Sequence, residues 1–229
     1  MNSDTDTLRK QTLASFLRFQ IALALMLFVP AWTLDFWQAW LYWAVFGAAL
    51  LGLALYFVKH DPDLARRRLR VGARAETLRS QKIIQSIAGL GVVAIYVVAG
   101  FERHSAGVSI ASWISVAADL VVLAGLRITF VVFRENSFAA STVKVEPLQR
   151  VVATGPYALV RHPMYSASVL IFLATPLALG SRWAMIPAAL VSIMIVVRLL
   201  DEERHLAREL PGYAAYCRRV RWRLVPRVW

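Results

Sequence analysis

Six long apolar runs dominate this sequence. They cover about residues 13–34, 36–58, 83–101, 110–133, 164–179 and 183–200. A membrane-spanning helix needs about 20 apolar residues, and 59% of the chain is hydrophobic against 17% charged. A soluble domain of 229 residues has too small an interior for that excess. The runs predict an all-α, polytopic membrane protein with about six membrane-embedded helices in a single domain, residues 1–229.

Short polar breaks organise these runs into hairpins. Asp35 alone separates the first two runs, and Gly180-Ser181 separates the last two. We therefore expect two tight helical hairpins, one at each end of the chain. The last two runs are short for full spans, so whether they cross completely stays open at this point.

The basic residues set the expected orientation. The chain has 26 Lys and Arg against 14 Asp and Glu, a net charge of +12. With the N-terminus in the cytoplasm, 23 of the 26 lie in cytoplasmic segments or at their edges, and positive residues collect on that side. We expect an N-in, C-in topology with residues 59–82 and 134–163 cytoplasmic. The charge then faces anionic lipid, so we do not expect nucleic-acid binding. The excess of Arg over Lys suggests a GC-rich genome and a bacterial inner membrane.

The N-terminal part, residues 1–110, contains few residues that we expect to take part in binding or catalysis. Its loop from His60 to Lys82 is rich in arginine and predicts a short amphipathic helix on the membrane surface, with a role in setting topology. Cys217 is the single cysteine of the chain, which excludes a disulfide framework and a multi-cysteine zinc site. We expect no metal and no required protein partner.

The first polar cluster precedes residues 164–179. Gly155-Pro156 predicts a turn, and Pro163 suits the first turn of a helix. Arg161 and His162 then lie at the cytoplasmic mouth of that helix, whose N-terminus adds N–H groups. These groups can bind a carboxylate or phosphate. The alternative is a snorkelling arginine beside an interfacial tyrosine.

The second cluster follows the last apolar run. Helical spacing places Arg198, Glu202 and His205 on one face, and Asp201, Glu202 and Glu203 are adjacent acids. Such carboxylates can bind a ribose diol or an ammonium group, or they form an exposed acidic cap.

Two ionisable residues fall inside the fourth run. Asp119 and Arg127 are eight residues apart, about two helical turns, so we expect them on similar faces without direct pairing. Charged groups at membrane depth usually face the bundle interior and serve function. Arg127 could instead be a structural arginine bonded to helix carbonyls.

Two ordered motifs lie within about residues 120–226. The first is Thr154-Gly155-Pro156-Tyr157 with Arg161-His162-Pro163-Met164-Tyr165, and the second is Glu202-Glu203-x-x-Leu206 with Gly212-Tyr213-x-x-Tyr216-x-x-Arg219-Val220. They resemble the Arg-His-Pro-x-Tyr motif and the C-terminal pattern of the isoprenylcysteine carboxyl methyltransferase family.

The resemblance implies a methyltransferase core at residues 120–226 with a cytoplasmic cofactor site. It implies that S-adenosylmethionine binds at Tyr157, Arg161, His162, Pro163, Tyr165, Glu202 and Glu203. It further implies that Arg127, eleven residues before Phe138 and near Asn136, binds and orients the acceptor carboxylate. The eukaryotic members of the family have a histidine two residues beyond the phenylalanine, where this chain has Ala140.

The expected reaction is methyl transfer to a lipophilic or prenylated acceptor, with carboxyl O-methylation favoured. A sulfonium methyl is already activated, so its transfer requires alignment and desolvation more than an acid or base. Three alternatives remain open: N-methylation of a phospholipid or other amine, an NADPH-dependent membrane reductase, and a non-enzymatic membrane component.

Overall fold

The computed structural model describes residues 3–69, 76, 78–108, 110–136 and 151–229. Every regular element in these ranges is helical, which confirms the all-α part of the predicted fold class. The elements are α1 (Ser3–Ala31), α2 (Trp37–His60), α3 (Pro62–Leu69), α4 (Arg79–Ala106), α5 (Ser112–Glu135), the 3₁₀ turn η2 (Gly155–Ala158), α6 (Pro163–Ala178), α7 (Met185–Glu209) and α8 (Tyr213–Arg219).

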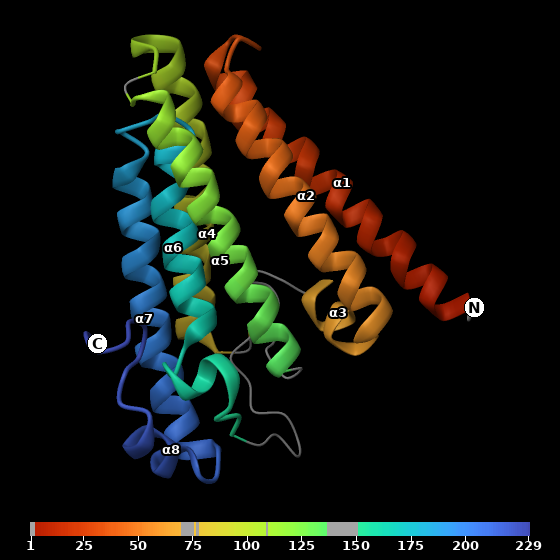
Figure 1. Cartoon of the computed structure of the whole chain (residues 1–229), viewed down its shortest axis with the longest axis vertical. Coiled ribbons are helices and arrows are strands. Elements are labelled where there is room, and N and C mark those ends of the chain that lie inside the picture. Colours follow the sequence, from red (N-terminus) through yellow and green to blue (C-terminus); the bar gives the residue numbers. More distant parts are fainter. Residues whose placement is uncertain (1–2, 70–75, 77, 109, 137–150) are drawn as a thin grey trace.

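Helices α4 to α7 form a bundle, and α1 and α2 form a hairpin beside it (Figure 1). Within the bundle α5 packs on α6, α4 on α7, and α6 on α7. The hairpin contacts the bundle through α1 on α4 and α2 on α5, and it leans outward toward the end where α3 lies. Both predicted hairpins are present, with turns at residues 32–36 and 179–184.

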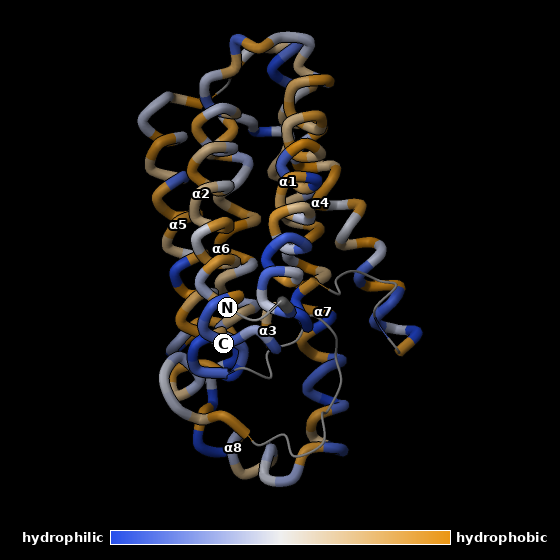
Figure 2. The backbone as a smooth tube through the Cα atoms, turned by 90° about the vertical axis from the view of Figure 1, so that its right-hand side faces the viewer, coloured by the Kyte–Doolittle hydropathy of each residue, from blue (hydrophilic) through white to orange (hydrophobic). Residues whose placement is uncertain are grey.

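Within the described part of the chain, four helices are long and apolar enough to cross a membrane: α1, α2, α4 and α5. Helix α6 has 16 residues, about 24 Å at 1.5 Å per residue, which is shorter than a bilayer core of about 30 Å. Helix α7 has 25 residues, but its second half carries charged side chains from Arg198 onward. Hydrophobic residues fill the long helices, and hydrophilic residues gather around α3 and α8 (Figure 2).

Exposed tryptophans mark the end of the molecule opposite α8. Trp32 follows α1, Trp37 begins α2, Trp113 lies in the first turn of α5, and Trp183 precedes α7. All four are exposed. Tryptophan is enriched at membrane–water interfaces, so these residues support a membrane–water interface at this end of the molecule.

The α1–α4 contact is close enough to exclude a side chain. A Cβ placed on Gly100 would lie 2.5 Å from the backbone oxygen of Leu27.

The predicted loop helix is present as α3, where Asp61 Oδ1 accepts a hydrogen bond from the Leu64 N–H at 3.0 Å. Its position on a membrane surface stays a prediction.

Asp119 and Arg127 do not share a face of α5. Asp119 is 3% exposed, whereas Arg127 lies on the exposed side with its guanidinium 5.2 Å from the centre of the Phe130 ring. Eight residues at 3.6 per turn exceed two turns by about 80°. That rotation turns Asp119 into the bundle and Arg127 away from it.

Candidate functional site

The segment before α6 is fixed by the C-terminal tail, residues 220–229. Gly155 has a φ of +55°, a conformation that favours glycine, and it begins the η2 turn. Pro163 begins α6 as predicted. The N–H groups of Arg161 and His162 donate to the carbonyls of Trp222 (2.9 Å) and Arg223 (3.0 Å). The tail therefore fixes the backbone of Arg161 and His162 directly before the first turn of α6.

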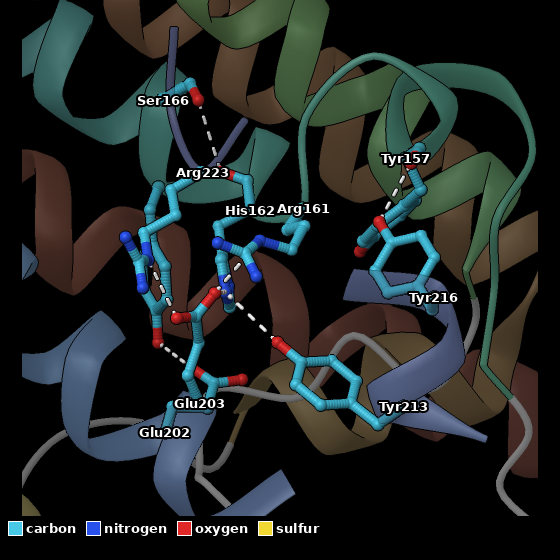
Figure 3. A network of polar contacts seen from close by, with 10 residues as sticks. Tyr157, Arg161, His162, Ser166, Glu202, Glu203, Tyr213, Tyr216 and Arg223 are labelled. Carbon is cyan, nitrogen blue, oxygen red and sulfur yellow. Dashed lines mark hydrogen bonds and ion pairs between the residues drawn. The ribbon is translucent and has the colours of Figure 1, made fainter. Parts of the chain in front are cut away.

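Glu203 contacts two arginines and a histidine at this point (Figure 3). Its Oε1 lies 3.1 Å from Arg161 Nε and 3.2 Å from His162 Nε2. Its Oε2 accepts a hydrogen bond from Arg223 Nε at 2.8 Å. Burial alone would raise the pKa of Glu203, but the hydrogen bonds from His162 and Arg223 and the charge of Arg161 lower it to about 2. Glu203 is therefore an ionised anchor between α7, the segment before α6, and the tail.

Two tyrosines of α8 complete this side of the site. Tyr213 OH lies 3.5 Å from His162 Nε2, and Tyr216 OH donates to the Tyr157 carbonyl at 2.8 Å. Burial raises the pKa of both tyrosines, so they stay protonated. The C-terminal motif that contains Tyr213 and Tyr216 thus packs against the segment that contains Tyr157, Arg161 and His162 (Figure 3).

Tyr165 and Glu202 form a second group beside the first. The Tyr165 hydroxyl donates to Glu202 Oε2 and accepts a hydrogen bond from Arg198 Nε at 3.0 Å. Arg198 Nη2 also pairs with Glu76 Oε1 at 2.7 Å, and both residues are buried. The structure therefore brings Tyr165, Glu202 and the first group to one end of α6 and α7.

Glu76 is a site residue that sequence reasoning missed. It lies in the segment between α3 and α4, where no helical periodicity or motif distinguishes it. Asp201 is held from the same side, because its Oδ2 accepts hydrogen bonds from Gln81 Nε2 (2.6 Å) and Ser80 Oγ (2.9 Å) of α4. The three predicted acids thus bind three separate sets of partners instead of forming an exposed cap.

The residues expected to bind the acceptor lie apart. Asn136 Nδ2 donates to Tyr157 OH at 3.1 Å, which ties the end of α5 to η2. Arg127 lines a groove between α2 and α5 together with Tyr56 and Phe130. Phe138 lies outside the described residues.

Arg68 of α3 is a second residue that the sequence did not single out. Its guanidinium lies 4.0 Å from the centre of the Phe133 ring, and its Nη2 is 3.1 Å from Met164 Sδ. Burial lowers the pKa of Arg68 to about 10. It is one of three consecutive arginines, and nothing in the sequence marks which of them turns inward.

Comparison with known families places this geometry in context. Residues 113–211 match the family model described as phospholipid methyltransferase. No curated protein matches the chain. The matched segment begins in α5 and ends just after α7, so it includes the Arg161–Tyr165 motif and the paired glutamates. The match confirms the resemblance to membrane methyltransferases and indicates a methyltransferase.

Proposed function

We propose that this protein transfers a methyl group from S-adenosylmethionine to a lipophilic acceptor at the cytoplasmic side of a membrane. The observation that carries the proposal is the convergence of Arg161, His162, Tyr165, Glu202 and Glu203 at one end of apolar helices. The family match over the same residues supports it independently.

The donor set fits the polar groups of this cofactor. A carboxylate has about four acceptor sites, and the described contact of Glu202 with Tyr165 occupies one. Glu202 can therefore also accept from an ammonium group or a ribose diol. His162 and Tyr165 lie with their rings stacked, centroids 5.7 Å apart, and would border the cofactor. Arg161 would bind its carboxylate. Glu203 would act by holding Arg161 and His162 in place.

Methyl transfer from a sulfonium requires the protein mainly to position the acceptor. When bound, S-adenosylmethionine would supply a methyl group on a sulfonium, and its transfer to a carboxylate gives a methyl ester without proton transfer. The residues of this chain would then align the acceptor and exclude water. A site with arginines, a histidine and carboxylates meets that requirement.

Carboxyl O-methylation is the reaction we favour, with Arg127 as the residue that orients the acceptor carboxylate. Arg127 borders the apolar groove between α2 and α5, from which a lipid head could approach. A second candidate is N-methylation of a phospholipid, which the description of the matching family favours. The two differ in the charge of the acceptor, because a cationic residue would repel a protonated amine.

Calorimetry on the purified full chain tests the cofactor assignment. We expect binding of S-adenosylmethionine and S-adenosylhomocysteine and none of NADPH. Removing one charge-assisted contact costs about 1.5–3 kcal/mol, so Glu202→Gln and His162→Ala should weaken binding by roughly 10-fold to 100-fold. Glu209→Gln, which changes an exposed carboxylate of the same helix, is the matched control. Unchanged affinity in both site variants, with the fold intact, would contradict the assignment.

The Arg127→Lys variant tests the acceptor. Lysine keeps the charge but loses the planar fork that binds a carboxylate in two places. Methyl transfer to a carboxylate lipid should fall by more than about 10-fold, since alignment is the main contribution of such a site. Cofactor affinity should stay unchanged. Normal turnover by this variant would remove Arg127 from the proposal.

A further inference from the structure

Four polar side chains form a line from the segment before α4 to the candidate site. Glu76 Oε1 lies 2.7 Å from Arg198 Nη2, and Arg198 Nε donates to the Tyr165 hydroxyl at 3.0 Å. The Tyr165 hydroxyl in turn donates to Glu202 Oε2. The side chain of Glu76 is completely buried, and that of Arg198 is 9% exposed. Water therefore has little access to the Glu76 end of this line.

Chemistry fixes the direction of each hydrogen bond in the line. A carboxylate only accepts and a guanidinium only donates, so the Tyr165 hydroxyl must accept from Arg198. The single proton of this hydroxyl is then left for Glu202. The position of the Arg198 guanidinium thus decides how Tyr165 contacts Glu202, and Glu76 is a carboxylate that holds this guanidinium.

Arg198 and Glu202 have the spacing of an ion pair within a helix. They lie four residues apart on α7, a spacing at which arginine and glutamate side chains are neighbours. Among the described residues, however, the carboxylate within ion-pair distance of Arg198 is that of Glu76, which lies outside α7. Glu76 therefore competes with Glu202 for the guanidinium. An ion pair between Arg198 and Glu202 would use acceptor sites of Glu202 that a ligand could otherwise occupy.

We propose that Glu76 is a positioning residue of the candidate site. It draws the Arg198 guanidinium away from Glu202, so that Glu202 binds the Tyr165 hydroxyl and keeps its other acceptor sites for a ligand. The inference rests on the proposed function for the identity of this ligand, which is the ammonium group or the ribose diol of S-adenosylmethionine. Glu76 itself does not touch the cofactor and acts through Arg198 and Tyr165.

The first turn of α4 supports the same part of α7. Asp201, the neighbour of Glu202, accepts hydrogen bonds from Ser80 Oγ at 2.9 Å and from Gln81 Nε2 at 2.6 Å. Gln81 is completely buried. These bonds fix the helix segment that carries Glu202. The effect of Glu76 is therefore on the pairing of side chains along a segment that other contacts already hold.

Calorimetry with S-adenosylhomocysteine on the purified full chain tests whether Glu76 acts through Glu202. Glu76→Gln keeps the size of the side chain but removes its charge, so Arg198 should turn to Glu202. At metal sites, groups that orient the ligating residues contribute about 10–100-fold to affinity, and we expect a loss of about 10-fold here. In a Glu202→Gln background the same change should cost no more than about twofold, because its route to the cofactor is gone.

Asp63→Asn is the matched control, because it changes an exposed carboxylate of the neighbouring helix α3. It should bind S-adenosylhomocysteine as the wild type does. A loss of equal size on Glu76→Gln in the wild-type and Glu202→Gln backgrounds would show that Glu76 acts independently of Glu202. That result, or unchanged affinity in Glu76→Gln, would overturn the proposal.

A measurement without cofactor separates this inference from the proposed function. Tyr165 is replaced by 3-fluorotyrosine, whose fluorine resonance reports the hydrogen bonds of the adjacent hydroxyl. The resonance should move in Glu76→Gln and stay in place in Asp63→Asn. If Glu76→Gln does not fold, Glu76→Asp, which keeps the charge but retracts the carboxylate, should still move it. An unmoved resonance in the Glu76 variant overturns the proposal. A moved resonance in a protein that binds no S-adenosylhomocysteine would sink the proposed function and leave the action of Glu76 on Tyr165 intact.

Discussion

Replacing Glu203 by glutamine should release the C-terminal tail from the site. Glu203 holds Arg161, His162 and Arg223 through its two oxygens. The side chains of Arg161 and His162 are 10% and 7% exposed, so water replaces a lost carboxylate poorly. Removing one partner of a buried ion pair costs about 3–5 kcal/mol. We take about 3 kcal/mol, because Arg223 is partly exposed and glutamine keeps one acceptor oxygen.

Hydrogen–deuterium exchange measures this loss at two defined amides. The N–H groups of Arg161 and His162 donate to carbonyls of the tail, at 2.9 Å and 3.0 Å. At about 1.4 kcal/mol per factor of ten, a cost of about 3 kcal/mol should speed their exchange roughly 100-fold. Glu209→Gln removes an exposed carboxylate from the same helix and should leave both rates unchanged. If the two variants exchange alike at these amides, Glu203 does not hold the tail, and the reasoning from its contacts is wrong.

Three further predictions concern pH, packing and topology. The pKa of Glu203 is lowered to about 2. The stability that ionised Glu203 contributes should therefore be complete above its ordinary pKa of about 4.3 and be lost as the pH falls toward 2. Pepsin should cleave the tail of the wild type faster as the pH falls from about 4.3 to about 2, and Glu203→Gln should show no such transition. Gly100→Ala should lower the thermal midpoint by roughly 2–12 °C, because its Cβ would meet the Leu27 carbonyl at 2.5 Å and overpacking costs about 1–3 kcal/mol. Gly89→Ala on the same helix, where nothing lies within 4 Å, should instead leave the midpoint unchanged or raise it slightly. A reporter fused after residue 229 should be active on the cytoplasmic side, and activity on the outer side would refute the N-in, C-in topology.

The sequence predicted the helices better than their ends. Apolar runs separated by Asp35 and by Gly180 predicted both hairpins, because each break is too short for anything except a turn. Helix α1 nevertheless begins at Ser3, about ten residues before the apolar run. Acidic residues at Asp4 and Asp6 suit a helix N-terminus, so the helix continues into a segment that hydropathy alone does not detect.

The sequence predicted which residues form the candidate site, but it did not predict which residues they bond. Turn chemistry and proline correctly placed Arg161 and His162 before α6. The sequence does not indicate that Trp222 and Arg223 return to accept hydrogen bonds from their N–H groups, because the tail has neither periodicity nor a local motif. Likewise Arg66, Arg67 and Arg68 are chemically identical in sequence, and the packing of α3 against α5 decides which one meets Phe133.

The docking of the tail has a consequence for how the protein matures. A ribosome makes the chain from its N-terminus, so α1 to α7 are complete before residues 222–224 exist. Until then, the amides of Arg161 and His162 and one oxygen of Glu203 lack the tail that bonds them in the finished protein. At about 5–20 residues per second, the tail follows Glu203 by about 1–4 s. The site is therefore completed after the apolar helices have been synthesised, and a message that stops before residue 222 would yield a protein in which the amides of Arg161 and His162 lack these tail partners.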